Sequence, residues 1–205
     1  MIIIRIESDC FTPFNDLKNN PIVNGRIHNI TKGSNCIEFP QPVNPFKNEL
    51  KSIPMHEQRS DAWFKQRENK LTSSDAGTVL GLNPYQKPKD VLFKKCGHDP
   101  KPFVGNIATR HGQKYEDEAI EKYCKLTGQK SYEFGLIAHE DVHGCDEYPW
   151  LAGSPDGISI SVTDPNAKPI LLEVKCPYKR KIVPGKIPEY YYPQVQLNMF
   201  ICGLE

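Results

Sequence analysis

The stretch GSPDGISISVTDPNAKPILLEVK, residues 153–175, decides the fold of this chain. In its first half, Ile158, Ile160 and Val162 alternate with small polar residues, a pattern typical of a strand with one buried face. Residues 170–175 form a second run, which is rich in β-forming residues. The turn-forming residues 163–166 lie between the two runs. The sequence therefore predicts an antiparallel hairpin.

This hairpin brings two carboxylates and a lysine together. Side chains alternate between the faces of a strand, so Glu173 and Lys175 point the same way. The other strand brings Asp156 close to Glu173. Carboxylates hold Mg²⁺, which polarises a phosphoryl group, and a neighbouring lysine can orient or deprotonate the attacking water. The carbonyl of Val174 is a further candidate metal ligand. These residues predict phosphodiester hydrolysis, and the alternative is an exposed hairpin whose cross-strand ion pair stabilises little.

Helical patterns surround the hairpin. Ser60 or Asp61 can cap the first helix, and one of residues 73–75 can cap the second. Glycine residues 81, 97 and 128 mark three helix ends. The predicted helices cover residues 61–67, 73–81, 89–96, 111–127 and 194–202, with Pro193 in the first turn of the last.

Residues 1–58 differ from the rest of the chain. They are rich in proline, asparagine and glycine and poor in helical periodicity. We expect at most short strands there, at residues 2–6 and 36–39. The sequence is therefore divided into an irregular N-terminal extension, residues 1–58, and a domain of residues 59–205.

Composition limits the classes of partner. The chain has 26 Lys and Arg against 25 Asp and Glu, a formal charge of +1, so binding of a polyanion has to be local. Seven cysteines without a C-x-x-C pair favour reduced thiols, and we expect an intracellular protein of the cytoplasm or nucleus. No apolar run is long enough to span a membrane, so no membrane partner is expected.

One group of residues has the types found in zinc sites. His139, His143 and Cys145 follow each other closely, and Cys96 and His98 offer further donors. A structural zinc site takes four ligands, and their usual paired spacing is missing. We therefore do not expect zinc.

Pro155-Asp156 followed by Glu173-Val174-Lys175 resembles the P-D…E-x-K signature of the restriction-endonuclease-like superfamily. A longer series of motifs is similar to the lambda exonuclease group of viral and phage recombination nucleases, also called YqaJ-like, over about residues 60–203. The resemblance implies an α/β (α+β) fold in which helices flank a central mixed β-sheet. The motifs are W-x-x-x-R at 63–67, T-S-S at 72–74, G-x-x-x-E at 112–116, G-S-P-D-G at 153–157, L-E-V-K-C-P at 172–177 and Q-V-Q at 194–196.

The resemblance also implies roles for the acidic residues. It makes Glu116, Asp156 and Glu173 ligands of Mg²⁺, with two ions expected and Mn²⁺ able to substitute. Lys175 becomes the base that activates water, and Gln194 supports the site. Without the resemblance, Glu116 is a solvated position in an acidic helix and Gln194 is polar helix surface.

In the same family an arginine and two serines hold the 5′-phosphate of the DNA end, which corresponds to Arg67, Ser74 and Ser154. A guanidinium and hydroxyls suit a terminal phosphate. The alternatives are a surface charge for Arg67 and a helix cap for Ser74. The family has a further arginine after K-C-P. Here Arg180 and Lys181 are both candidates for that contact.

The implied function is metal-dependent 5′-to-3′ degradation of double-stranded DNA ends in recombination, repair or replication. A single-strand annealing protein is the expected protein partner, and a homo-oligomer is compatible with the family. The alternatives are a structure-selective endonuclease of the same superfamily, a catalytically silent DNA-end-binding protein, and an adaptor for an annealing protein that acts through residues 1–58.

Overall fold

The structure is a computed structural model that describes residues 2–5, 50, 52–98, 105–144, 147–164, 166–183 and 185–204. Of the two short strands predicted in the N-terminal extension, the first is present as β1, Ile2–Arg5. The second, at residues 36–39, lies outside the described residues.

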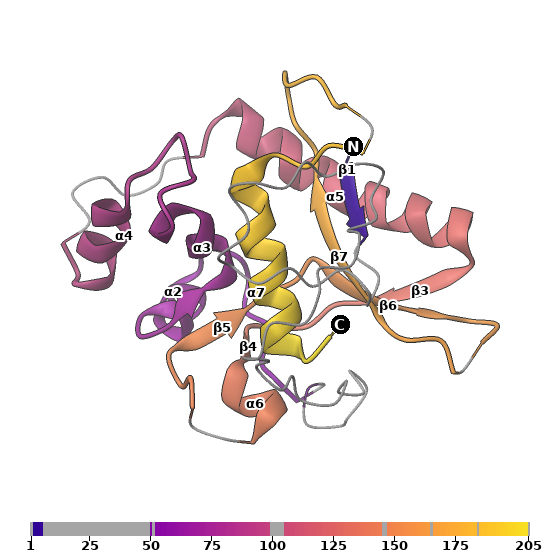
Figure 1. The fold of residues 1–205 in the computed structure, drawn as a ribbon, viewed down its shortest axis with the longest axis horizontal. Coiled ribbons are helices and arrows are strands. Elements are labelled where there is room, and N and C mark those ends of the chain that lie inside the picture. The colour runs from indigo at the N-terminus through magenta and orange to yellow at the C-terminus, as the bar shows by residue number, and fades with distance from the viewer. Residues whose placement is uncertain are drawn as a thin grey trace, which may run out of the picture.

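The predicted hairpin is confirmed. Strand β6, Gly157–Ser161, pairs antiparallel with β7, Ile170–Lys175, with Gly157 opposite Leu172. Strand β3, Gln129–Tyr132, lies on the other side of β6, and β1 pairs antiparallel with β7. These strands form an antiparallel sheet in the order β1-β7-β6-β3 (Figure 1).

A second, smaller sheet has the order β2-β5-β4. Strand β2, Leu71–Thr72, runs parallel to β5, Leu151–Gly153, and β4, Ile137–Ala138, runs antiparallel to β5. The mixed α/β class with flanking helices is confirmed, with a mixed sheet and an antiparallel sheet in place of one continuous sheet. Pro155 has no N–H to donate and lies between β5 and β6, which favours a break in the ladder at this point.

The first three predicted helices are present with shifted ends. Helix α2, Asp61–Arg67, is capped by Ser60, whose side chain accepts from the N–H of Trp63. Helix α3, Ser73–Val79, begins after Thr72 and not at one of the three predicted caps, because the Asp75 carboxylate accepts from both the N–H and the hydroxyl of Thr72. Helix α4 spans Pro88–Lys95.

The two long helices start earlier than the sequence predicted. Helix α5, Ile107–Thr127, begins after Asn106, whose side chain accepts from the N–H of Thr109, and ends at Gly128, which has a positive φ of 67°. A short 3-10 turn η2, Glu189–Tyr191, leads into α7, Tyr192–Cys202. The short helix α6, His139–His143, was not predicted.

Helix α7 forms the centre of the molecule. It packs against α3 and contacts strands of both sheets (Figure 1). Its residues Val195 and Ile201 are fully buried with Ile137, Ile158 and Leu171 from the strands. A smaller apolar cluster lies between α5 and β7 and contains Tyr123, Ile170 and Leu172. Strand β7 is therefore held between α7 and α5, which fixes the position of Glu173.

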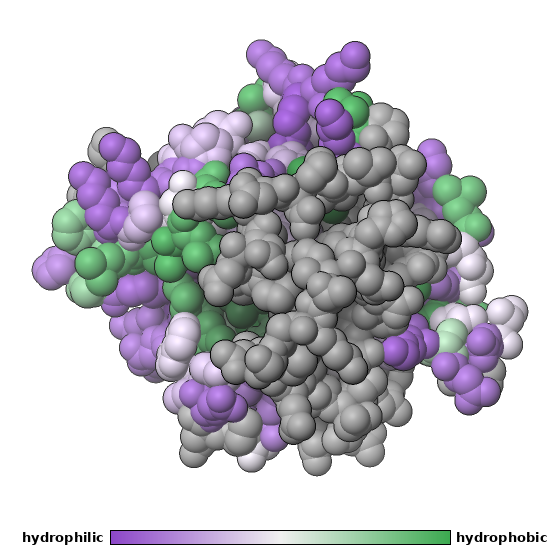
Figure 2. All heavy atoms as spheres, in the orientation of Figure 1, coloured by the Kyte–Doolittle hydropathy of each residue, from purple (hydrophilic) through white to green (hydrophobic). Residues whose placement is uncertain are grey.

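Several apolar side chains of α3 and α4 are exposed. Figure 2 shows green surface on the side of the molecule where these two helices lie. Among the described residues, no helix is both long and apolar enough to cross a membrane. The cysteines in that part of the chain, Cys96, Cys124, Cys176 and Cys202, are free thiols.

Candidate active site

Glu173 is a fully buried carboxylate in the middle of β7. Its Oε1 accepts hydrogen bonds from Lys175 Nζ and from Gln194 Nε2, the latter at 2.5 Å. Its Oε2 accepts from Asn198 Nδ2 at 3.2 Å. Because both oxygens are bonded, the cost of burying this charge is partly offset.

The two amide donors come from one face of α7. Gln194 and Asn198 are one helical turn apart, so both face β7, which α7 contacts. Asn198 is completely buried, and a Cβ at Gly153 would lie only 2.4 Å from its Oδ1. Gly153 therefore provides the space for Asn198. Sequence reasoning missed Asn198, although a polar residue four positions after Gln194 in an apolar helix is a usable signal.

Asp156 lies in the segment between β5 and β6. Its Oδ2 accepts a 2.6 Å hydrogen bond from the N–H of Val174 and lies 4.0 Å from Lys175 Nζ. Burial raises the pKa of Asp156, while Lys175 and the Val174 hydrogen bond oppose the rise. Asp156 and Glu173 therefore share one lysine.

Glu116 reaches this group from α5, which packs against β7. Cys176 Sγ donates to the carbonyl of Tyr115 at 3.6 Å, which ties the end of β7 to the helix next to Glu116. Burial raises the pKa of Glu116 to about 7, the charge of Asp156 adds to the rise, and Lys175 opposes it. The structure therefore places Glu116 where it acts electrostatically on the other two acids.

Lys175 is the cation of the group. Burial lowers its pKa, but the charges of Glu173 and Asp156 outweigh burial and raise it overall. Burial likewise raises the pKa of Glu173 to about 7, with Lys175 opposing and Asp156 adding to the rise. We call these four residues, Glu116, Asp156, Glu173 and Lys175, the acid–lysine cluster.

The cluster has the donor chemistry for a hard divalent cation, since carboxylate and carbonyl oxygens are the preferred ligands of Mg²⁺. The described residues contain no group of three or more His, Cys, Asp or Glu side chains already arranged around a common metal position. Burial is the largest cause of the raised pKa values of Glu116 and Glu173, the neighbouring acids add to the rise, and Lys175 opposes it only in part. The residues therefore fit a divalent cation in chemistry and charge.

The two serines predicted to bind phosphate lie at one edge of the smaller sheet. Ser74 follows β2, and Ser154 follows β5. The strands are parallel with Thr72 opposite Ala152, so their carboxyl ends lie side by side. Ser74 is exposed, and its hydroxyl lies 2.9 Å from that of Thr72.

Arg67 is linked to the same edge through Asp75. Burial lowers the pKa of Arg67 to about 10, and the charge of Asp75 opposes this. The guanidinium stacks on Trp63, with 3.9 Å from Cζ to the ring centroid. Sequence reasoning missed Lys95, whose Nζ donates to the carbonyl of Arg67 at 3.0 Å and lies 3.5 Å from Asp75. No motif contains Lys95, and only its contacts reveal it.

Arg180 and Lys181 have different surroundings. Arg180 is half-buried, its Nη1 donates to Tyr190 Oη at 2.5 Å, and its Cζ lies 5.3 Å from the ring centroid of Tyr191. Lys175 Nζ lies 5.4 Å from the same ring. Lys181 is exposed. The structure thus brings Arg180, and not Lys181, beside the acid–lysine cluster.

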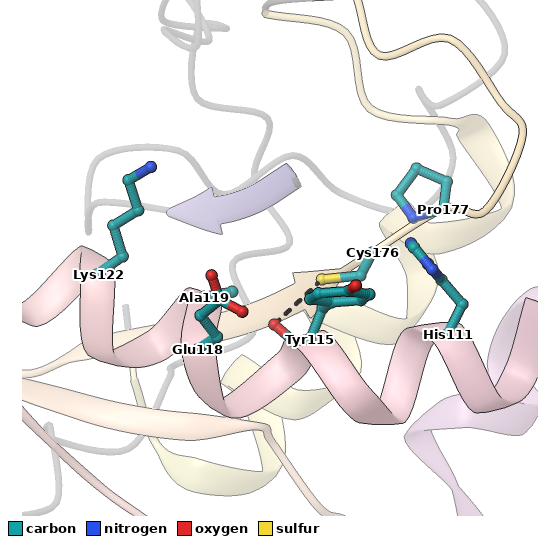
Figure 3. A pocket seen from close by; sticks show the side chains of 7 residues that line it. All are labelled: His111, Tyr115, Glu118, Ala119, Lys122, Cys176 and Pro177. Carbon is teal, nitrogen blue, oxygen red and sulfur yellow. Dashed lines mark hydrogen bonds between the residues drawn. The ribbon is translucent and has the colours of Figure 1, made fainter.

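A cavity of about 280 Å³ lies next to the cluster, between α5 and the segment after β7. In Figure 3, His111 and Tyr115 of α5 point toward Cys176 and Pro177. None of the four residues of the acid–lysine cluster is among the residues that line this cavity. The acid–lysine cluster therefore lies beside this hollow, not inside it.

The two histidines considered as zinc donors, His139 and His143, contact each other and the end of α7. The rings of His139 and His143 lie 4.2 Å apart, and His139 is buried. His143 Nε2 lies 3.2 Å from the carbonyl oxygens of Phe200 and Ile201 at the end of α7. Cys145 lies outside the described residues.

The fold and the arrangement of its strands define a restriction-endonuclease-like α/β protein. A sequence profile of the YqaJ-like viral recombinase domain matches residues 62–205, and the chain belongs to this family. The predicted family resemblance is thereby confirmed.

Three relatives illustrate the range of the family. Protein R354 of Acanthamoeba polyphaga mimivirus is 34% identical over 166 residues, which cover 76% of this chain and 29% of R354. Protein D345L of African swine fever virus, strain Badajoz 1971 Vero-adapted, is 28% identical over 70% of this chain and 46% of its own length. YqaJ of Bacillus subtilis is 24% identical over 73% of this chain and 44% of YqaJ. The chain thus spans less than half the length of each.

Among solved structures, the alkaline exonuclease LHK-Exo of Laribacter hongkongensis is similar to this chain, with a TM-score of 0.53 and 26% identity. The likeness covers 71% of this chain and 70% of LHK-Exo. That protein has also been solved in complex with dAMP, in a structure with a TM-score of 0.52 to this chain. This chain therefore shares the fold of a protein named as an alkaline exonuclease.

Proposed function

We propose that this chain carries the catalytic domain of a divalent-metal-dependent exonuclease that degrades one strand of double-stranded DNA ends in the 5′-to-3′ direction. The observation that carries the proposal is the acid–lysine cluster, in which Asp156 and Glu173 share Lys175 at the C-terminal end of β7. We assign the domain to residues 59–205, and the profile match from residue 62 supports this boundary.

The metal ligands in this proposal are Glu116, Asp156, Glu173 and the carbonyl of Val174. The N–H and C=O of one strand residue point to the same side, so the hydrogen bond from Val174 to Asp156 supports a carbonyl directed toward that carboxylate. Mg²⁺ held there, with two ions expected, would polarise the phosphoryl group and lower the pKa of a bound water. Mn²⁺ has similar ligand preferences and would substitute.

Lys175 orients the attacking water and takes up its proton. The acids around it raise its pKa, so it is protonated in the arrangement described above. Removing that proton requires the negative charge of Glu173 and Asp156 to be neutralised first. The proposal therefore couples the base role of Lys175 to occupation of the acidic ligands. Gln194 and Asn198 keep the Glu173 oxygens in place throughout.

The 5′-phosphate of the DNA end is assigned to Arg67, Ser74 and Ser154, with Arg180 as a second cation. The parallel pairing of β2 with β5 supports placing both serines at one edge. Ser74 is exposed and Ser154 half-exposed, so their hydroxyls are accessible to a ligand. A terminal phosphate carries more charge than an internal phosphodiester, and a guanidinium beside hydroxyls favours it.

The proposal is tested with linear duplex DNA carrying either a 5′-phosphate or a 5′-hydroxyl, and with closed circular DNA of the same sequence. We expect nucleotides to be released from the 5′-phosphorylated linear duplex in Mg²⁺, slower release from the 5′-hydroxyl duplex, and an intact circle. Lys175→Ala protein serves as the matched control. Cleavage of the circle would favour a structure-selective endonuclease. Binding of ends without release of nucleotides would favour an end-binding protein.

A further inference from the structure

The loop between α3 and α4 presents an exposed aromatic ring. The side chain of Tyr85 is 82% exposed. Its backbone is nevertheless fixed, because the N–H of Tyr85 donates to Asn83 Oδ1 at 2.9 Å and Asn83 Nδ2 donates to Thr78 Oγ1 at 2.8 Å. Loops that a rigid scaffold holds in place often carry binding residues, and Tyr85 is positioned in this way.

Tyr85 is the outer end of a row of rings that reaches the acid–lysine cluster. Its ring centroid lies 6.0 Å from that of Tyr190 in an edge-to-face arrangement. The ring of Tyr190 lies 4.3 Å from that of Tyr191, and Lys175 Nζ lies 5.4 Å from the centroid of Tyr191. We call Tyr85, Tyr190 and Tyr191 the tyrosine row.

One glycine anchors both parts of the row. The carbonyl of Gly77 in α3 accepts hydrogen bonds from the N–H groups of Leu82 and Asn83, at 2.9 and 3.1 Å, which positions the Tyr85 loop. A Cβ at Gly77 would lie 2.4 Å from the carbonyl oxygen of Tyr190. Gly77 therefore allows the backbone of Tyr190 to pack directly against α3, so the row is held as one unit.

Positive charge accompanies the row. Arg180 donates through Nη1 to Tyr190 Oη, whereas its Nη2 is buried and has no hydrogen-bond partner in the described part of the chain. Lys87 and Lys89 are exposed just beyond Tyr85. Aromatic rings interleaved with cations suit a flexible polyanion with flat bases better than an apolar protein surface.

We propose that the tyrosine row is a stacking surface for the bases of a single DNA strand that leads to Lys175. The proposal rests on the proposed function, because it gives the substrate strand a path to that site. Every base has a π-face, so the surface binds without sequence preference. Tyr85 stacks on a base outside the site, and Arg180 keeps the contact to the 5′-phosphate that the proposed function assigns to it.

Binding of a dye-labelled single-stranded oligonucleotide is measured by fluorescence anisotropy in EDTA, where the proposed hydrolysis cannot proceed. We expect Tyr85→Leu to weaken binding about 10-fold and Tyr85→Trp to retain it, since stacking needs an aromatic ring. An abasic oligonucleotide of the same length should bind wild-type protein and Tyr85→Leu equally. Trp150→Leu is the matched control, because Trp150 is a 50% exposed ring just before β5 and is not part of the row.

The proposal is overturned if Tyr85→Leu binds the oligonucleotide as tightly as wild-type protein, or if it loses as much affinity for the abasic probe as for the normal one. Either result leaves the proposed nuclease function standing. A protein partner for Tyr85 would give that same unchanged DNA binding. If wild-type protein binds through Tyr85 as expected but releases no nucleotides from any duplex in Mg²⁺, the nuclease function fails and the stacking surface stands. The two failures are thereby distinguishable.

Discussion

The backbone N–H of Val174 donates a 2.6 Å hydrogen bond to the carboxylate of Asp156. Pairing between β6 and β7 ends with Gly157 opposite Leu172, so Val174 lies two residues beyond the last position of β7 that pairs with β6. The Asp156 side chain therefore replaces the missing strand partner. This bond sets the position of Asp156 relative to Glu173 and Lys175, which flank Val174 on β7.

Asp156→Asn tests whether this carboxylate contributes charge or only the hydrogen bond. The asparagine oxygen can still accept from Val174, so we expect the melting temperature in EDTA to be unchanged or higher. Nuclease activity in Mg²⁺ should fall more than about 100-fold, because even indirect partners of metal ligands contribute about 10–100-fold. Near wild-type activity in a folded Asp156→Asn protein would contradict the assignment of Asp156 as a ligand.

Asn198 and Gln194 should act by holding Glu173. We expect Asn198→Ala and Gln194→Ala each to raise the Mg²⁺ concentration needed for half-maximal activity about 10–100-fold. Met199→Leu, a volume-conserving change at a buried position of the same helix, is the control and should behave as wild type. If the Mg²⁺ requirement stays the same in both alanine variants while the melting temperature falls, the two amides have a structural role only.

The pKa values predict how stability depends on pH. Burial is the largest cause that raises the pKa of Glu116 and Glu173 from the ordinary 4.5 to about 7. Between these values the two groups bind more protons in the folded protein than in the unfolded chain, so the stability that they contribute is fully present below the lower value and is lost as pH rises through the upper one. In EDTA we expect the melting temperature to be roughly 5 °C lower at pH 8 than at pH 5.5.

Two comparisons check that this pH effect comes from the acid–lysine cluster. Glu173→Gln removes one of the titrating carboxyls and should flatten the dependence of melting temperature on pH. Mg²⁺ should restore stability at pH 8 more than at pH 5.5, because protons compete with the cation for the same oxygens. An identical pH profile in Glu173→Gln would show that other groups control it.

The sequence predicted the hairpin and the grouping of Asp156, Glu173 and Lys175 because strand alternation and turn residues are local signals, whereas Glu116 was predicted from the family resemblance alone. Glu173 and Lys175 share a face by periodicity alone. Asn198 was missed because its role depends on α7 crossing β7 at one particular place, which no local pattern encodes. The Thr72 cap was missed because the Asp75 side chain, and not propensity, determines where α3 starts.

The sequence also could not predict that the strands form two separate sheets. Strands β2, β4 and β5 have two or three residues each and pair over long distances in the chain, so no period is long enough to detect. The motif order nevertheless located Ser74 and Ser154, which the parallel pairing of β2 and β5 then places at one edge. The family resemblance thus identified Ser74 and Ser154 as candidates. Periodicity in the sequence could not have predicted that they lie close together.

Arg180 and Lys181 can be told apart by their dependence on the DNA end. Arg180 has a buried Nη2 without a partner among the described residues and lies beside Tyr191, whereas Lys181 is exposed. A hydrogen bond to a charged group contributes about 1.5–3 kcal/mol, so Arg180→Ala should lower kcat/KM on 5′-phosphorylated duplex about 10–100-fold. Lys181→Ala should change it less than about 3-fold, as for an exposed ion pair. The measurement is the initial rate of nucleotide release at low substrate concentration, with both variants at the same ionic strength. A larger loss in Lys181→Ala than in Arg180→Ala would reverse the assignment and place the second phosphate contact on the exposed lysine.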